Sequence, residues 1–259
     1  MVQLGGRFGG IRCVDVWWPG GPEEVEPLLV SAPVVLVRQC TRATGDSLQR
    51  SAFRRRTSPT LLVDLTRPVD ALWSDLHAKS CRAKVRKAEA LDCRVLVGQD
   101  AGDAIGLVAA HISRLGYMRP PSEERWRELQ EAGEVFAVAH EDRLLAAHLF
   151  LADERRARML YSGTAPRSDR DVDRLAGWAN RYLHWWEILH YRERGLRVYD
   201  LGGIDMNPSS PLYSITEFKR SFGGSVVPEE SVYVAGNAVL RRGLRAASRT
   251  RLVVRRALN

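Results

Sequence analysis

GEVFAVAHEDRLLAAHLFLAD, residues 133–153, is the stretch that decides the fold class of this 259-residue chain. Two apolar runs flank the short turn EDR, which predicts a β-hairpin. ARMLYSGTA at 157–165 predicts a third strand, a helical pattern follows over 168–194, and LRVYDLGG at 196–203 returns to a short strand. Strands, a long helix and another strand in this order predict an α/β sheet domain.

The long helix carries its own boundary signals. Ser168 and Asp171 resemble a capping box, and Gly195 is placed to end the helix. Its expected apolar face is marked by Leu175, Trp178, Tyr182 and Leu189. Downstream, ITEFKRSFGG at 215–224 predicts one or two helical turns stopped by glycines, and SVVPEESVYVA at 225–235 predicts a last strand.

Upstream of the hairpin the pattern is less regular. Residues 1–59 are expected to form short strands and loops, with a buried strand at 28–39 after a helix that begins near Pro22. We interpret 47–59, SLQRSAFRRRTSP, as a polar, basic connection. The remaining expected elements are a strand at 60–65, a basic helix over 69–91, a strand at 93–98, a helix over 103–115 and a helix over 122–132 capped by Ser122.

Composition is that of a globular protein, with 45% hydrophobic and 27% charged residues. No apolar run is long enough for a spanning helix, and the first residues lack the apolar core of a secretion signal. We therefore expect a cytoplasmic protein. The cysteines at 13, 40, 81 and 93 form no C-x-x-C pair, and the histidines show no ligand spacing, so we expect reduced thiols and no metal.

The net charge of +8 is concentrated at the end of the chain. Residues 236–259 hold seven arginines and no acid, and without them 32 basic and 31 acidic residues remain. Such a segment suits a polyanion, either RNA phosphates or an anionic membrane surface. A solvated helix that only aids solubility explains it equally well, and the charge pattern does not choose between them.

Three segments together resemble one known family. They are LWSDLHAKSCRAKVRKAEALDCRV at 72–95, LYSGTAPRS at 160–168 with the long helix and GLRVYDLGGID at 195–205, and ITEFKRSFGGSVV at 215–227. The first resembles that family's stretch of repeated basic residues, and the last its Phe-Lys pair before a Phe-Gly-Gly turn. On these grounds the chain resembles the Fem family of aminoacyltransferases, over roughly residues 60–234.

The resemblance implies a fold and a reaction. The implied fold is α/β, a GNAT-like mixed sheet flanked by helices, with a shortened N-terminal GNAT-like lobe. We divide the chain accordingly into 1–93, the lobe with the basic helix, 94–235, the catalytic domain, and 236–259, the Arg-rich tail. The implied donor is aminoacyl-tRNA, without a separate cofactor. The implied acceptor is the amine of a cell-wall peptide precursor, a peptide natural product or another small molecule.

Aminolysis of an aminoacyl ester requires placement of the amine and stabilisation of the developing oxyanion. The chain has no G-x-S-x-G elbow or Cys-His signature, which agrees with direct transfer. By the resemblance, Phe218 and Lys219 meet the 3′ end of the donor, where Phe218 stacks on adenine and Lys219 balances negative charge. The alternative is an amphipathic helix with Phe218 buried and Lys219 in solvent.

Other candidates carry alternatives of their own. Asp200, at the end of a strand, orients or deprotonates the amine, or else holds the glycine turn after it. Substrate binding is assigned to Tyr161, Ser162, Tyr213, Glu217, Lys84 and Arg86, and tRNA binding is extended to Arg241, Arg242 and Arg245.

Two other functions stay open. An acyl-CoA-dependent N-acyltransferase needs a Gly-rich loop for pyrophosphate, whereas TAPRSDRDVDR at 164–174 has no glycine and three aspartates. A non-catalytic protein that binds RNA or a membrane surface through its tail is the other. In that case peripheral membrane contact would run through Leu240, Leu244, Leu252 and Val253. The transferred amino acid, the general base and the oligomeric state are not encoded in these patterns.

Overall fold

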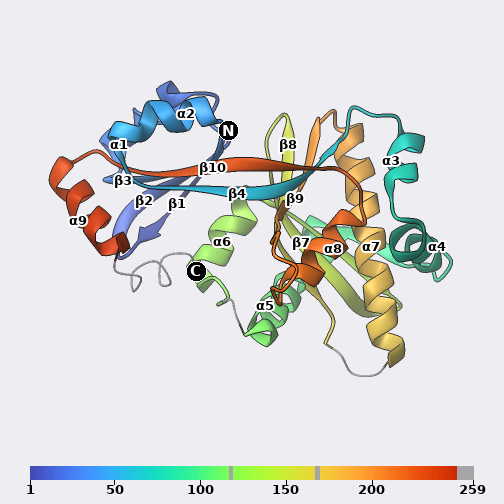
Figure 1. Cartoon of the computed structure of the whole chain (residues 1–259). Helices are drawn as coiled ribbons and strands as arrows, with labels where there is room; N and C mark the ends of the chain where they lie inside the picture. Colours follow the sequence, from blue (N-terminus) through green and yellow to red (C-terminus); the bar gives the residue numbers. More distant parts are fainter. Residues whose placement is uncertain (117–118, 167–169, 250–259) are drawn as a thin grey trace. The chain divides into compact units, whose positions relative to one another are not determined.

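A computed structural model of the chain describes residues 1–116, 119–166 and 170–249 (Figure 1). Contacts between backbone positions divide the chain into two compact units. The smaller unit joins the two ends, Met1–Pro59 and Pro228–Asn259, and the larger unit is Thr60–Val227. These units do not follow the three sequence segments expected above, which stay a prediction.

The sheet of the smaller unit brings the first strands together with the last. Its order is β1 (Val2–Phe8), β2 (Ile11–Trp17), β3 (Val34–Cys40) and β10 (Ser225–Ala235). β2 and β3 are parallel, and the other two pairs are antiparallel. Gly9 and Gly10, both with positive φ, make the turn between β1 and β2. The last strand, predicted at 225–235, is confirmed with the same bounds.

Two predictions in this region were wrong. Residues 28–39 were expected to be one strand, but Leu28–Ser31 form the short helix α1 and β3 starts at Val34. Residues 47–59 were expected to be a connection, but β4 runs over Ala52–Asp64. The arginines of this segment obscure the alternation that would have predicted a strand. Its first residues, Ala52 and Phe53, are nevertheless buried in the apolar clusters of the smaller unit. The other helical segments here are η1 (Pro22–Glu24), α2 (Arg42–Ser47), η2 (Leu48–Arg50) and α9 (Ala238–Arg249).

The larger unit holds the rest of the strands. Its sheet has the order β4, β9 (Val198–Gly203), β8 (Arg156–Thr164), β7 (Arg143–Ala152), β6 (Glu134–His140) and β5 (Arg94–Val97). β8 and β9 are parallel, while the remaining neighbours are antiparallel. The predicted hairpin is β6 and β7, and the predicted third strand is β8. The α/β class with a mixed sheet is therefore confirmed.

The helices of this unit are mostly where the patterns put them. They are α3 (Val69–Asp75), the π-helical turn η3 (Ala78–Arg82), α4 (Ala83–Glu89), η4 (Gly98–Ala101), α5 (Ala104–Leu115), α6 (Glu123–Ala132), α7 (Arg170–Glu193) and α8 (Tyr213–Arg220). Ser122 caps α6 through the backbone N–H of Arg125, as predicted. The expected capping box begins at Ser168, which lies outside the described residues.

The expected single helix over 69–91 is interrupted, which corrects that prediction. Leu76 and His77 have extended backbone conformations between α3 and η3. The His77 backbone N–H donates to the carbonyl of Ser221, and its ring Nδ1 accepts from the N–H of Ser80. A partner distant in sequence and a local cap thus replace the helical hydrogen bonds at this point.

Helices α5 and α7 cover opposite faces of the sheet. Gly163 faces α5, because a Cβ there would lie 2.7 Å from the Cα of Val108. The preceding residue, Ser162, pairs with His148, whose ring bonds Glu187 on α7. The register of β7 and β8 shifts at Leu160, which has no opposite residue. This bulge re-aims the side chains of β8, so Arg156, Arg158 and Tyr161 share the face of α5.

In the described part of the chain, no helix has the length and apolarity that crossing a bilayer requires.

Candidate functional site

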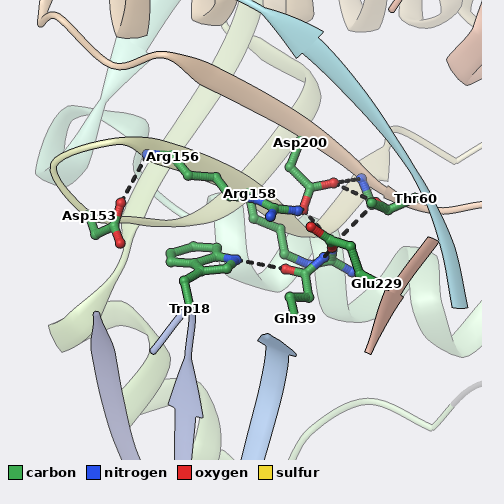
Figure 2. Close-up of polar contacts among 9 residues, drawn as sticks. Trp18, Gln39, Thr60, Asp153, Arg156, Arg158, Asp200 and Glu229 are labelled. Carbon is green, nitrogen blue, oxygen red and sulfur yellow. Dashed lines mark hydrogen bonds and ion pairs between the residues drawn. The ribbon is translucent and has the colours of Figure 1, made fainter. Parts of the chain in front are cut away.

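A buried carboxylate organises the carboxyl end of β9. Asp200 is 0% exposed, and its Oδ1 accepts from the Thr60 hydroxyl at 2.6 Å and from the N–H of Gly202 at 2.7 Å. Its Oδ2 accepts from Arg156 at 2.5 Å and from Arg158 at 2.6 Å (Figure 2). Both oxygens are therefore engaged, and two guanidinium groups balance one negative charge.

This pairing determines the protonation of Asp200. Burial alone would raise the pKa of Asp200, but Arg158, Arg156 and the hydroxyl of Thr60 together lower that pKa below its ordinary range. A carboxylate so strongly stabilised is a poor proton acceptor. Of the two roles considered above, the geometry favours the second, in which Asp200 holds the two glycines that follow it. Gly202 and Gly203 lie within β9, where its register with β4 shifts, and we call this bend of the strand the glycine turn.

Lys219 lies against that turn. It occupies α8, is only 8% exposed, and its Nζ donates to the carbonyl of Gly203 at 2.7 Å. Burial and the nearby charge of Arg158 lower the pKa of Lys219 to about 8, while Asp200 opposes this shift. The expectation of a solvated lysine is thereby excluded. An amine that is buried, cationic near neutral pH and next to a further cation is placed to meet negative charge.

Gly202 allows this approach. Its φ of +87° lies in the left-handed region. A Cβ added there would lie 3.4 Å from Nζ of Lys219 and 3.5 Å from the carbonyl oxygen of Met159. Glycine is thus favoured by the backbone conformation, while an added Cβ would make only ordinary van der Waals contacts.

Phe218, the neighbour of Lys219, is half-buried. Its ring packs against His184 and Phe222, with centroids 5.6 and 5.2 Å apart. The guanidinium of Arg181 lies 4.7 Å from the ring centroid. Phe218 therefore joins the core at its edge, and Arg181 covers part of it.

Tyr161 and Ser162 do not share a surface. Tyr161 packs against Trp126 of α6 at 5.1 Å, on the face that also carries Asp200. Ser162, one residue later, points to the face of α7. One acceptor site cannot contact both side chains on the same face of the sheet, so Tyr161 is the better candidate beside Asp200.

The remaining predicted residues of this unit lie on helices. Lys84 and Arg86 are on α4, where Lys84 is half-buried and the exposed Arg86 lies over the ring of Trp73 at 5.5 Å. Tyr213 and Glu217 are one turn apart on α8, the first half-buried and the second exposed.

Arg241, Arg242 and Arg245, the predicted tRNA-binding arginines of the tail, belong to α9 in the smaller unit. Arg241 and Arg245 donate to the backbone carbonyls of Ala235 and Ala52, whereas Arg242 is exposed. Leu240 and Leu244 pack against an apolar cluster that includes Phe8, so they cover their own unit. Leu252 and Val253 lie outside the described residues.

A polar network that the sequence reading missed lies under α7. His148 Nε2 donates to Asn180 Oδ1, and His148 Nδ1 shares a hydrogen bond with Glu187 Oε1, each at 2.7 Å. The Tyr199 hydroxyl donates to Glu187 Oε2 at 2.7 Å and contacts His184 Nδ1 at 2.6 Å. The sequence signal was available, since His184 and Glu187 are three residues apart on an otherwise apolar helix face.

This network could also be read as a metal centre. Ligand atoms of His148, His184 and Glu187 lie within 4.8 Å of one another, and all three residues are buried. Side-chain atoms of all three residues already form hydrogen bonds with one another or with Tyr199. Burial, together with the charges of His148 and Lys219, lowers the pKa of His184 well below its ordinary value. We interpret the group as a structural hydrogen-bond network.

The smaller unit has a polar cluster of its own. Trp18 Nε1 donates to Gln39 Oε1 at 2.9 Å, and Gln39 Nε2 donates to Glu229 Oε2 at 2.5 Å (Figure 2). Trp18 and Gln39 have φ of 54° and 52°, which is uncommon for residues other than glycine. These hydrogen bonds hold the ends of β2 and β3 in that conformation.

A separate cavity of about 310 Å³ runs along α5. It is lined by Asp103, Gly106, Leu107, Ala110, Arg114, Leu144 and Pro166. None of these belongs to the predicted site residues.

The arrangement of sheet and helices defines a class. The fold is GNAT/FemX-like, with TM-scores above 0.5 to several solved structures. FemX matches with a TM-score of 0.62 at 15% identity, covering 91% of this chain and 83% of that chain. L-PGS from Bacillus licheniformis matches with 0.57 at 13% identity, covering 95% and 85%. A C-terminal DUF2156 domain from Agrobacterium fabrum matches with 0.57 at 15% identity, covering 95% and 84%.

Part of the sequence also matches a known family. Residues 113–229 match the model of the FemAB family. The match contains β6 to β9, α7 and α8, and with them Asp200, Phe218 and Lys219. Among curated proteins, no sequence is detectably similar to this chain.

Proposed function

We propose that this protein transfers an aminoacyl group from aminoacyl-tRNA to the amine of a peptide-like acceptor. The observation that carries the proposal is the buried Lys219 amine at the glycine turn of β9, inside the segment that matches the FemAB family. The acceptor class follows the resemblance, a cell-wall precursor or a peptide natural product. Because tRNA is charged in the cytoplasm, we expect the reaction there.

The proposed reaction needs no group beyond those of the chain and its substrates. The acceptor nitrogen attacks the ester carbonyl carbon, the amide bond forms, and the bond from that carbon to the ribose oxygen breaks. The proton lost by the amine is gained by the ribose oxygen. During attack the carbonyl oxygen becomes negative, and a fixed ammonium group stabilises it without reorganisation.

Lys219 suits this role because of its surroundings. Its hydrogen bond to Gly203 fixes the position of Nζ, and burial strengthens any interaction with an anion. Asp200 acts through its neighbours in this proposal. It fixes Arg158 and the N–H of Gly202, and so shapes the turn that holds Lys219.

The experiment measures transfer of labelled amino acids from a total pool of aminoacyl-tRNA to a panel of amines, beside labelled acetyl-CoA with the same panel. We expect RNase-sensitive transfer from tRNA. Lys219→Ala should lower it about 100-fold, the usual effect of removing one group that stabilises an oxyanion. Arg220→Ala is the matched control, because Arg220 is the adjacent cation of α8 but is exposed, and it should change the rate less than twofold.

Transfer from acetyl-CoA alone would overturn the proposal in favour of an acyl-CoA-dependent enzyme. Equal loss in the Lys219→Ala and Arg220→Ala variants would remove Lys219 from its assigned role. A role for the tail is better tested with Arg242→Gln than by deleting residues 236–259, since deletion would also strip Leu240 and Leu244 from the core of the smaller unit.

A further inference from the structure

Cations of two helices of the larger unit, α4 and α7, lie next to one another. Lys84 and Lys87 are three residues apart on α4, and Trp178 and Arg181 are three residues apart on α7. Lys87 Nζ lies 4.8 Å from the ring centroid of Trp178, and the charge of Arg181 acts on Lys84. Residues three apart share a helix face, so the four side chains form two adjacent pairs.

A residue of α8 lies next to these cations. The guanidinium of Arg181 lies over Phe218, the residue before Lys219. We call Lys84, Lys87, Trp178, Arg181 and Phe218 the α4–α7 strip. It alternates cations with aromatic rings and ends beside the proposed site of aminoacyl transfer.

The cations of the strip have no matching acids. Among the described residues, no carboxylate forms an ion pair with Lys84 or Arg181, and Nε of Arg181 is buried without a hydrogen-bond partner. Burial lowers the pKa of both Lys84 and Arg181, and each cation on α4 or α7 next to Lys84 lowers it further. Like charges gathered in a half-buried place are costly, and an anion bound between them removes that cost.

The alternation identifies the kind of anion. Single-stranded nucleic acids are held by cations that follow the phosphates and by aromatic or guanidinium planes on which the bases stack. Lys84, Lys87 and Arg181 supply the first, and Trp178, Phe218 and the Arg181 plane supply the second. A lone phosphate of a lipid or nucleotide sugar would account for the cations but not for the interleaved rings.

We infer that the α4–α7 strip binds the single-stranded 3′ end of an RNA, with bases stacked between its rings and phosphates on Lys84 and Arg181. This inference rests on the proposed function, in which that RNA is the aminoacyl donor. It assigns Lys84, which was predicted above to bind the acceptor, to the binding of the donor instead. Arg86 is not part of the strip, because it lies over Trp73 and near Glu89.

The test is direct binding without catalysis, using the full chain. The probe is a fluorescein-labelled ACCA oligoribonucleotide, with a blunt RNA hairpin and phosphatidylglycerol vesicles as comparison ligands. Trp178→Leu keeps apolar packing but removes the ring, and should weaken ACCA binding about tenfold. The pair Lys84→Gln with Arg181→Gln should weaken it at least as much, and should flatten the slope of log K against log salt by roughly 1.4, for two phosphates.

Lys79→Gln is the matched control, since Lys79 is an exposed lysine one turn before the strip in the same segment. It should change ACCA affinity less than twofold. The inference is overturned if the strip variants bind ACCA as Lys79→Gln does. It is also overturned if they lose only vesicle binding, or if they raise only the KM for the acceptor.

The two proposals fail separately. If transfer from aminoacyl-tRNA depends on Lys219 while strip variants keep full ACCA affinity, only the strip inference is wrong. If ACCA binding is lost as expected while no aminoacyl transfer is found with any amine, the RNA site stands and the proposed reaction is wrong.

Discussion

Two polar clusters of the larger unit each bury a carboxyl group, and they accommodate it in different ways. Around Asp200, one carboxylate faces two guanidinium groups, a hydroxyl and a backbone N–H. Around Glu187, an equally buried carboxyl group faces an imidazole and a phenol, and burial raises the pKa of Glu187. The cluster of Asp200 keeps its carboxylate ionised, whereas burial in the network of Glu187 favours the neutral carboxyl group.

The difference matches their positions. The cluster of Asp200 lies at a strand end, against the turn that holds Lys219, where fixed charge can act on a substrate. The network of Glu187 links α7 to β7 and β9 within the apolar core. An ion cluster next to a site and a hydrogen-bond network inside the core should therefore respond differently to the same kind of substitution.

The largest expected effect is that of Asp200→Asn. It removes the buried carboxylate that Arg156 and Arg158 share, which should lower the free energy of unfolding by about 3–5 kcal/mol. Urea denaturation measures this. Asp171→Asn is the control, since Asp171 pairs with Arg174 but is 85% exposed, and should cost at most about 1 kcal/mol. Similar losses for both variants would contradict the assigned importance of the buried cluster.

Glu187→Gln should lower the free energy of unfolding by less than Asp200→Asn does. The amide keeps one hydrogen bond of the network and loses another, for a loss of about 1–3 kcal/mol by the same urea measurement. Transfer activity should keep its dependence on pH, because no charge next to Lys219 is removed. A loss greater than that of Asp200→Asn would reverse the comparison and show Glu187 to be the ionised partner of His148.

Gly202→Ala tests the link between the Asp200 cluster and Lys219. Alanine at a φ of +87° is strained, by about 1–2 kcal/mol, and its Cβ would be in contact with Nζ of Lys219. We expect a shifted titration of Lys219, followed by NMR after reductive methylation of the lysines. Gly195→Ala, also at positive φ but with no atom near its added Cβ, is the control for strain alone. Identical titrations in both variants would show that the turn does not position Lys219.

The smallest expected effect is a pH dependence. The folded-state pKa of Lys219, about 8, lies below that of a lysine in the unfolded chain, so the unfolded chain binds more protons at pH values between the two. The free energy of unfolding should therefore rise with pH, by about 1 kcal/mol from pH 8 to 9. Lys219→Met should lack this rise, and a rise of the same size in that variant would assign it to another group. Transfer that requires the protonated amine should fall over the same interval.

Segments with a regular apolar pattern and clear end signals were predictable from the sequence. The hairpin of β6 and β7, β8, α6 with its Ser122 cap and β10 follow from alternation and capping, which are local properties. The start of β4 was missed because three arginines obscure its alternation, although Ala52 and Phe53 are buried. The interruption at His77 was missed because its partner, Ser221, is far away in the sequence.

The candidate site shows the same limit. A strand end and the Phe-Lys pair were enough to point to Asp200 and Lys219. Nothing local could indicate that Arg156 and Arg158 would neutralise Asp200, because the pairing depends on the parallel register of β8 and β9. The placement of Tyr161 on the same face as Arg156 and Arg158 depends on the bulge at Leu160, and the α4–α7 strip depends on how two helices pack.

The hydrogen bond from His77 to Ser221 also bears on how the chain folds as it is made. While residues 69–91 leave the ribosome, their own pattern favours one continuous helix, and Ser221 has yet to be synthesised. The break can be set only when that late segment docks. The nascent chain should therefore pass through a helix that the finished protein does not contain, and the last step of folding in this region is its partial unwinding.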